Sequence, residues 1–195
     1  MKIIGLTGSI AMGKSTAADF FKQAGISVFS ADETVHQLYK SKPILSLIEH
    51  TFPGVVENGK VNRLKLSKIL INDSEKLQTL EEIIHPLVQE KEKEFIDKAR
   101  QQGKKIVVLD IPLLFEKKGE KRVDSVIVVS APLAIQKERI MTRPDMNEKK
   151  ISFINAKQMP DEKKRERADF IINTGKDLEN THQQVFSVIE NLLKN

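Results

Sequence analysis

The sequence predicts an α/β fold built on a doubly wound, five-stranded parallel sheet. Five short apolar segments supply the strands, at residues 2–6, 26–31, 105–110, 125–130 and 169–173. Each is almost continuously apolar, which is typical of strands covered on both faces. Helical patterns lie between the segments and would form crossovers on the two faces of the sheet.

A phosphate-binding motif follows the first strand. Residues 8–15 (GSIAMGKS) match G-x-x-x-x-G-K-[ST] at every fixed position, with a predicted strand before them and a predicted helix after them. The glycines let the backbone turn its N–H groups inward, toward a phosphate at the helix N-terminus. Lys14 would contact the β- and γ-phosphates, and the Ser15 hydroxyl would bind Mg²⁺. The predicted nucleotide-binding residues of this P-loop are Gly8, Ala11, Met12, Gly13, Lys14, Ser15 and Thr16.

The interior of the P-loop is poor in glycine. Ser9, Ala11 and Met12 occupy positions where glycines are common in related loops. Because alanine disfavours a positive φ, the sequence predicts ordinary dihedrals at Ala11.

The first predicted helix begins at the P-loop, and Gly25 is its expected stop. After the second strand, residues 41–102 contain helical patterns and no convincing strand, so they predict a helical insertion. In a kinase this insertion would bind the acceptor of the phosphoryl group. His85-Pro86 is expected to interrupt a long helix there. Residues 1–40 and 103–195 would form the core of a single unit.

Two segments complete the chain. Residues 144–168 form a predicted lid, and within it residues 159–167 (MPDEKKRER) are nearly devoid of apolar side chains. That part predicts a solvated helix or a mobile cover. The C-terminal segment predicts an amphipathic helix with Leu178, Val185, Ile189, Leu192 and Leu193 on one face.

Composition limits the setting of the protein. The chain has 195 residues, no cysteine and a net charge of +5. The missing cysteines exclude disulfides and thiolate metal sites and fit a reducing compartment. No apolar run approaches the ~20 residues that span a bilayer, and the N-terminus lacks a signal-peptide pattern. We therefore expect a cytoplasmic protein without a membrane partner, and a monomer.

The basic excess is concentrated late in the chain. Residues 136–167 contain ten Lys or Arg and six Asp or Glu, a net charge of +4. Such a stretch indicates an anionic partner or a solvated helix face.

GTPases can be set aside among the P-loop proteins. Asp110 is followed by Ile-Pro-Leu rather than by the D-x-x-G of GTPases, and no N-K-x-D occurs. A compact P-loop domain with a helical insertion and a polar, Arg-containing late segment is typical of small-molecule kinases. The late segment would close over ATP and exclude water.

Six segments in the same order resemble the dephospho-coenzyme A kinase family, almost end to end. They are IGLTGSIAMGKST, VFSADETVHQL, EEIIHPLV, VVLDIPLLFE, QKERIMTRPD and NAKQMPDEKKRERADFIINT. Two positions depart from the family pattern. Ser30 replaces a common Asp, and Lys157 replaces the usual Arg.

The resemblance implies a P-loop kinase fold and transfer of the ATP γ-phosphoryl group to the ribose 3′-hydroxyl of dephospho-CoA. ATP and Mg²⁺ would be required, with ATP and dephospho-CoA as small-molecule partners. Asp32 would be the base, since it lies just past the second strand at the carboxyl edge of the sheet and would face the P-loop from the neighbouring strand. The predicted catalytic residues are Asp32, Lys14 and Arg139. Arg143 and Asn173 would also bind the nucleotide, and Asp32, His85 and Arg165 would bind the acceptor. Ser15 and Asp110 would bind the metal.

Six of these residues have a plainer alternative. Asp32 could cap the following helix, and Asp110 could cap a strand end rather than hold Mg²⁺. Arg139 and Arg143, four apart on one predicted helix face, could contact phosphates or only surface groups. His85 could mark the helix break, and Arg165 could be a solvated lid residue.

Three other functions stay open at this point. A nucleoside or nucleoside-monophosphate kinase would differ in its acceptor site. A nucleic-acid-binding ATPase would need stacking aromatics among its basic residues, but residues 136–167 contain only Phe153, so no nucleic-acid partner is expected. A nucleotide-binding regulator without turnover would not need Asp32 together with Lys14.

Overall fold

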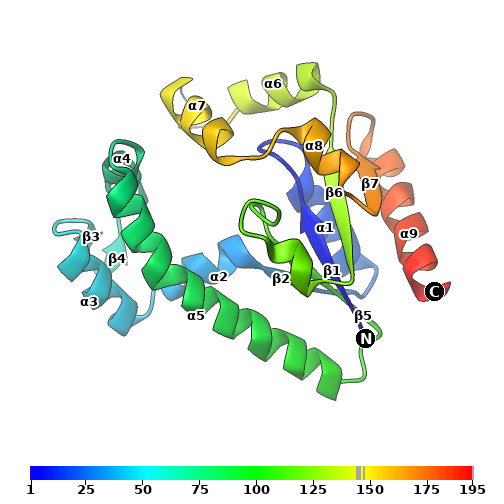
Figure 1. The fold of residues 1–195 in the computed structure, drawn as a ribbon, viewed down its shortest axis with the longest axis horizontal. Coiled ribbons are helices and arrows are strands. Elements are labelled where there is room, and N and C mark those ends of the chain that lie inside the picture. The colour runs from blue at the N-terminus through cyan, green and yellow to red at the C-terminus, as the bar shows by residue number, and fades with distance from the viewer. Residues whose placement is uncertain (144–145, 147, 195) are drawn as a thin grey trace. The chain divides into compact units, whose positions relative to one another are not determined.

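The computed structural model describes residues 1–143, 146 and 148–194, and it confirms the predicted α/β fold (Figure 1). Five parallel strands form one sheet in the order β2-β5-β1-β6-β7. Their bounds are Lys2–Thr7 (β1), Ser27–Ser30 (β2), Ile106–Asp110 (β5), Ser125–Ser130 (β6) and Phe170–Asn173 (β7). Strand β5 lies between β1 and β2, so the prediction that β2 neighbours the P-loop strand was wrong.

Two helices cover one face of the sheet. Helix α1 (Lys14–Gln23) and helix α9 (Leu178–Lys194) pack on alternate residues of the strands. Buried residues of this core include Leu6, Phe21, Ile127, Val185 and Leu192. Aliphatic side chains dominate this core. Leu178 and Leu193 are exposed, so the predicted apolar face of α9 was wrong at these two positions, near its two ends.

The other face is covered less regularly. The segment after β5, with a 3₁₀ helix at Gly119–Arg122 (η1), packs Leu114 and Phe115 against Val126 and Val128 of β6. Helix α8 (Asp161–Glu166) contacts β6 as well. Two further helices, α6 (Leu133–Met141) and α7 (Glu148–Lys157), follow β6 in the chain.

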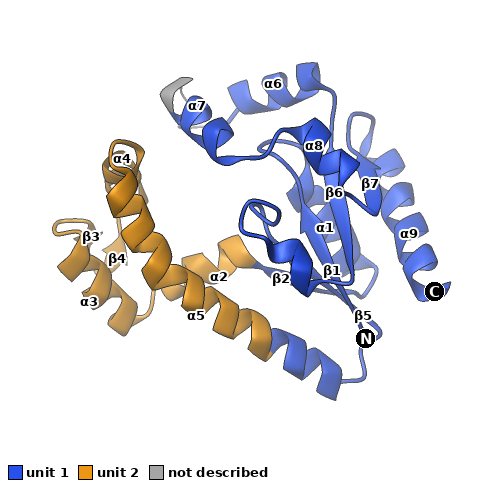
Figure 2. Cartoon of the chain, in the orientation of Figure 1, with its two compact units in different colours: residues 1–30, 95–195 blue, residues 31–94 orange. Residues whose placement is uncertain are grey.

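The chain forms two compact units, shown in different colours in Figure 2. Unit 1 comprises Met1–Ser30 and Phe95–Asn195, and contains the sheet; unit 2 comprises Ala31–Glu94. Unit 2 has its own apolar core, in which Ile48, Phe52, Val55 and Leu66 are buried. Its helices are α2 (Ala31–Leu38), α3 (Lys42–Thr51), α4 (Arg63–Ile71) and most of α5 (Ser74–Gln101). The predicted insertion at 41–102 thus begins and ends about ten residues later than this unit.

Unit 2 corrects two predictions. It contains a short antiparallel hairpin, β3 (Val56–Glu57) and β4 (Lys60–Val61), where no strand was expected. Asn58 and Gly59 both have positive φ, as a tight hairpin turn requires. Helix α5 continues through Pro86, although a break was expected there. Pro86 lies on the exposed side of the helix, where water can satisfy the carbonyl that loses its partner.

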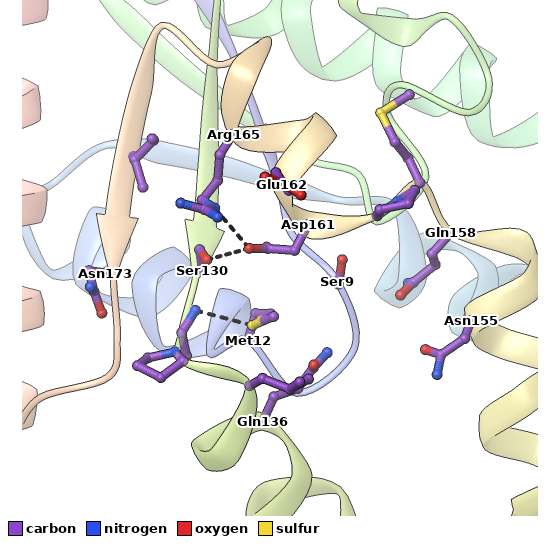
Figure 3. Close-up of a pocket in the computed structure, with 16 residues that line it drawn as sticks. Ser9, Met12, Ser130, Gln136, Asn155, Gln158, Asp161, Glu162, Arg165 and Asn173 are labelled. Carbon is purple, nitrogen blue, oxygen red and sulfur yellow. Dashed lines mark hydrogen bonds and ion pairs between the residues drawn. The ribbon is translucent and has the colours of Figure 1, made fainter.

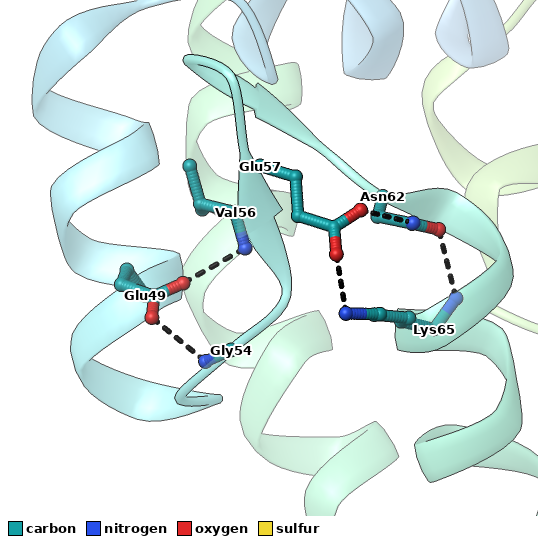
Figure 4. A network of polar contacts seen from close by, with 6 residues as sticks. All are labelled: Glu49, Gly54, Val56, Glu57, Asn62 and Lys65. Atoms are coloured by element: carbon teal, nitrogen blue, oxygen red, sulfur yellow. Dashed lines mark hydrogen bonds and ion pairs between the residues drawn. The ribbon is translucent and has the colours of Figure 1, made fainter.

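Carboxylates fix the turns around the hairpin (Figure 4). Glu49 accepts the backbone N–H groups of Gly54 and Val56, at 2.7 and 2.8 Å. Glu57 accepts from the side chains of Asn62 and Lys65. The bonds from Gly54 and Val56 lower the pKa of Glu49, and those from Asn62 and Lys65 lower the pKa of Glu57. The ionised forms therefore stabilise this part of the fold.

Acid is expected to weaken unit 2 through these carboxylates. A carboxylate whose pKa is lower in the folded than in the unfolded state stabilises the fold. This stabilisation is complete when the pH is above the unfolded-state pKa, about 4.3 for Glu, and it is lost as the pH falls through the folded-state pKa. Glu49→Gln should therefore lower Tm more at pH 7 than at pH 3, as measured by circular dichroism. The control Glu90→Gln changes an exposed carboxylate of α5 and should leave Tm nearly unchanged at both values. An equal Tm loss for Glu49→Gln at both pH values would contradict this account.

Candidate active site

The P-loop connects β1 to α1 and needs glycine at two points. A Cβ on Gly8 would lie 2.5 Å from the carbonyl oxygen of Val129, and Gly13 has φ 81° at the N-terminus of α1. Ala11 has φ 60°, so the prediction of ordinary dihedrals there was wrong. The turn that brings Met12 N to Ser9 O places Ala11 in the left-handed region, where its Cβ costs about 1–2 kcal/mol. The loop is thus shaped by local turns that the fixed motif positions do not reveal.

Lys14 and Asp110 form an ion pair at the carboxyl end of the sheet. Asp110 is the last residue of β5 and lies beside Leu6 of β1 in the register of the sheet. The two side chains are only 14% and 10% exposed. Ser15, the next residue after Lys14, is exposed in the first turn of α1. The structure therefore brings the predicted phosphate-binding lysine to the predicted metal-binding carboxylate.

Arg139 and Arg143 do not share a helix face as predicted. Helix α6 ends at Met141, and Arg143 lies exposed beyond it. A proline follows Arg143 in the sequence and disfavours helical backbone there. Arg139, within α6, donates from Nη1 to Thr174 Oγ1 at 2.9 Å and from Nη2 to the Thr174 carbonyl at 2.7 Å.

Two glutamine side chains form hydrogen bonds with the backbone of Ile10 in the P-loop. Gln158, which directly follows α7 in the predicted lid, accepts the Ile10 N–H at 3.0 Å. Gln136 of α6 donates to the Ile10 carbonyl at 2.8 Å. Neither glutamine was among the residues predicted for the site. The lid and α6 are therefore both tied to the nucleotide loop.

A pocket of about 630 Å³ lies beside the P-loop in unit 1 (Figure 3). Asn155 and Gln158 line one side, and Asn173, at the end of β7, lies on the opposite side. Arg165 also lines the pocket and donates from Nε to Asp161, whose carboxylate accepts from Ser130 as well. Pro132, Leu133 and Ile171 add apolar lining. Two predicted ligand-binding residues, Asn173 and Arg165, thus belong to the same pocket.

The second part of the lid is anchored to the sheet. Lys164 is fully buried and forms an ion pair with Glu116 at 2.9 Å. Glu116 also accepts the backbone N–H of Met159. Arg167 stacks on the Phe115 ring and pairs with Glu120 at 2.7 Å. Residues 159–167 are mostly exposed and include helix α8, as the solvated-helix alternative expected, but Lys164 within them is buried, which the shortage of apolar residues did not reveal. Residues 144, 145 and 147 of the predicted lid lie outside the described residues.

Removing the Lys164 charge is expected to destabilise unit 1 strongly. Lys164→Met leaves the Glu116 carboxylate without its buried cationic partner, which costs about 3–5 kcal/mol in comparable sites. The free energy of unfolding can be measured by urea titration. Lys163→Met makes the same change at the neighbouring exposed position of α8 and should cost far less. Similar losses in the two variants would show that the Lys164–Glu116 pair contributes little.

Two predicted residues lie in unit 2. Asp32 is exposed in the first turn of α2, two residues after β2 ends. Since α2 begins at Ala31, Asp32 is not its N-cap, and the capping alternative was wrong. His85 is exposed within the continuous helix α5, so it marks no helix break.

The chain is similar in sequence to a known protein family over nearly its whole length. A family model described as dephospho-CoA kinase matches residues 2–180. The chain belongs to the dephospho-CoA kinase family. It is 97% identical over 195 residues to the dephospho-CoA kinase of Bartonella quintana (strain Toulouse), with 100% of both chains covered. It is 49% identical over 192 residues to that of Brucella melitensis, with 98% of this chain and 96% of the relative covered.

A solved structure has the same fold. A protein of Thermus thermophilus superposes with a TM-score of 0.81 at 30% identity, covering 98% of this chain and 97% of the other. Dephospho-CoA kinases catalyse the last step of coenzyme A synthesis, and the resemblance in six segments identified this family correctly. The match to the family model covers the P-loop, the pocket and the lid.

Proposed function

We propose that the chain transfers the γ-phosphoryl group of ATP to the ribose 3′-hydroxyl of dephospho-CoA, giving coenzyme A and ADP through the residues described above. The observation that carries the proposal is the P-loop lysine paired with Asp110 at the carboxyl end of the sheet. This is the edge at which ligands bind in open α/β sheets. Lys14 and the backbone N–H groups of the loop hold the transferring phosphates.

The metal-binding residues are Ser15 and Asp110. They offer one hydroxyl and one carboxylate, and among the described residues no group of three His, Cys, Asp or Glu could hold a metal. So small a donor set suits Mg²⁺, which keeps several waters and takes its other ligands from phosphates. When bound, the ion neutralises charge on the phosphates.

The pocket beside the P-loop takes the nucleoside end of ATP in this proposal. Its apolar lining by Pro132, Leu133 and Ile171 suits a flat base, and Asn173 offers amide groups at its edge. Arg139 and Arg143 neutralise developing phosphate charge. The hydrogen bonds of Gln158 and Gln136 to Ile10 hold the lid and α6 against the P-loop, where the lid excludes water from the transferred group.

Asp32 is the proposed general base, which accepts the proton of the 3′-hydroxyl as the phosphoryl group moves. His85 is a proposed acceptor contact. Arg165 was expected to contact the acceptor, but it lines the pocket proposed for ATP, so we place its contact with the nucleotide instead. Among the described residues, no helix is long and apolar enough to cross a membrane. We also propose that the enzyme is a monomer and that it lies in the cytoplasm, a reducing compartment that a chain without cysteine fits.

The acceptor tests this proposal most directly. Dephospho-CoA should be used with a kcat/KM at least ~10²-fold above that of adenosine or AMP, as charge-assisted contacts to its diphosphate arm would provide. Initial rates of ADP release, with each acceptor at matched Mg-ATP, measure this ratio. Equal efficiency with adenosine or AMP would assign the chain to the nucleoside or nucleotide kinases instead.

A further inference from the structure

A buried threonine joins Arg139 to the P-loop. Thr174 is 4% exposed and follows β7 directly. Its hydroxyl accepts from Arg139 Nη1 at 2.9 Å and donates to the carbonyl oxygen of Met12 at 2.8 Å. Its own carbonyl accepts from Arg139 Nη2 at 2.7 Å. One residue therefore binds the guanidinium group through two atoms and binds the nucleotide loop through a third contact.

Both ends of this chain of hydrogen bonds are fixed. The Thr174 N–H donates to Ser130 O at 2.9 Å, which ties Thr174 to β6. Met12 is 3% exposed, and its sulfur accepts the Ala131 N–H at 3.1 Å (Figure 3). A Cβ on Gly13 would lie 2.8 Å from Thr174 Oγ1, so the hydroxyl packs directly on the loop backbone. Thr174 is thus held at a set position relative to the P-loop.

The bonds to Thr174 fix the plane of the guanidinium group. They use one hydrogen on each terminal nitrogen of Arg139. The second hydrogens and the Nε–H stay available for phosphate oxygens, in the fork geometry that makes arginine suited to phosphates. Without the two bonds, the long side chain would sample several rotamers and would seldom present this fork.

We propose that Thr174 is the positioning residue that aligns Arg139 with the phosphates on the P-loop. The inference rests on the proposed function, since it requires that Arg139 contacts the transferring group. It adds a residue that has no direct role in the chemistry but sets the orientation of one that does. Misplacing a catalytic group by a small distance costs about 10²-fold in rate, so the effect falls on kcat.

A double-mutant cycle tests the proposal. Thr174→Val keeps the shape of the side chain but removes the hydroxyl, and it should lower kcat with dephospho-CoA and Mg-ATP by about 10- to 100-fold. The KM for ATP should change much less. Thr174→Ser restores the hydroxyl and should recover most of the rate. In an Arg139→Ala background, Thr174→Val should cost less than about twofold, because the residue acts through the arginine.

Thr181→Val provides the matched control. Thr181 is 2% exposed in α9, and its hydroxyl bonds only to the Asp177 carbonyl of its own helix end among the contacts described. This variant should keep wild-type kcat, and thermal unfolding of all variants will separate folding from rate. A slow Arg139→Ala with a normal Thr174→Val would overturn the positioning role alone. A normal Arg139→Ala would overturn it together with the role of Arg139, whereas absence of turnover by the wild-type chain would overturn the proposed function itself.

Discussion

Asp32→Asn is expected to lower kcat with dephospho-CoA by about 10²–10⁴-fold, the usual effect of losing a general base. Asparagine keeps the size of the side chain but cannot accept the hydroxyl proton. Because Asp32 is exposed in the first turn of α2 and caps nothing, the fold should tolerate the change. Steady-state rates at saturating Mg-ATP measure the loss, and the KM for ATP should change little.

Glu33→Gln supplies the control for Asp32. Glu33 is the other acidic residue in the first turn of α2 and is also exposed. The variant makes the same change of charge next to Asp32 and should keep kcat within about twofold, as expected of an ordinary surface position. If the two variants lose activity equally, the effect is one of general charge and Asp32 is not the base.

Lys14→Met is expected to lower kcat by about 10²–10³-fold or more, since it removes a cation that stabilises charge developing in the transition state. Methionine keeps the aliphatic part of the side chain. The variant also removes the ion-pair partner of Asp110, so some loss of Tm is expected beside the loss of rate. Rates and thermal unfolding should be measured on the same preparations.

Lys22→Met separates these effects. Lys22 lies in the last turn of α1 and is half exposed, paired with Asp19. The same substitution there should leave kcat unchanged and cost little stability, because exposed ion pairs contribute little. A Lys14→Met enzyme with half the wild-type kcat would refute the assignment of the P-loop.

Local patterns predicted most of the fold and part of the site. The apolar segments identified the five strands of the sheet, because a parallel sheet buries both faces, and the P-loop motif identified Lys14. The order of the strands did not follow, so the place of β2 was wrong. The Asn58-Gly59 pair was the available signal for the missed hairpin. Lys164 and Thr174 had no such signal, since their burial depends on Glu116 and Met12, which are distant in sequence.

The Lys14–Asp110 pair changes what nucleotide binding has to achieve. The lysine and the carboxylate together carry no net charge, so the attraction of the loop for phosphate begins with its N–H groups and the N-terminus of α1. For the Lys14 ammonium group to bind a phosphate, it must either contact the phosphate and Asp110 together or give up Asp110 for the phosphate. The free energy gained is then the difference between two ionic contacts rather than the full value of one. The pairing that keeps Lys14 oriented therefore lowers the affinity that this lysine can give to the nucleotide.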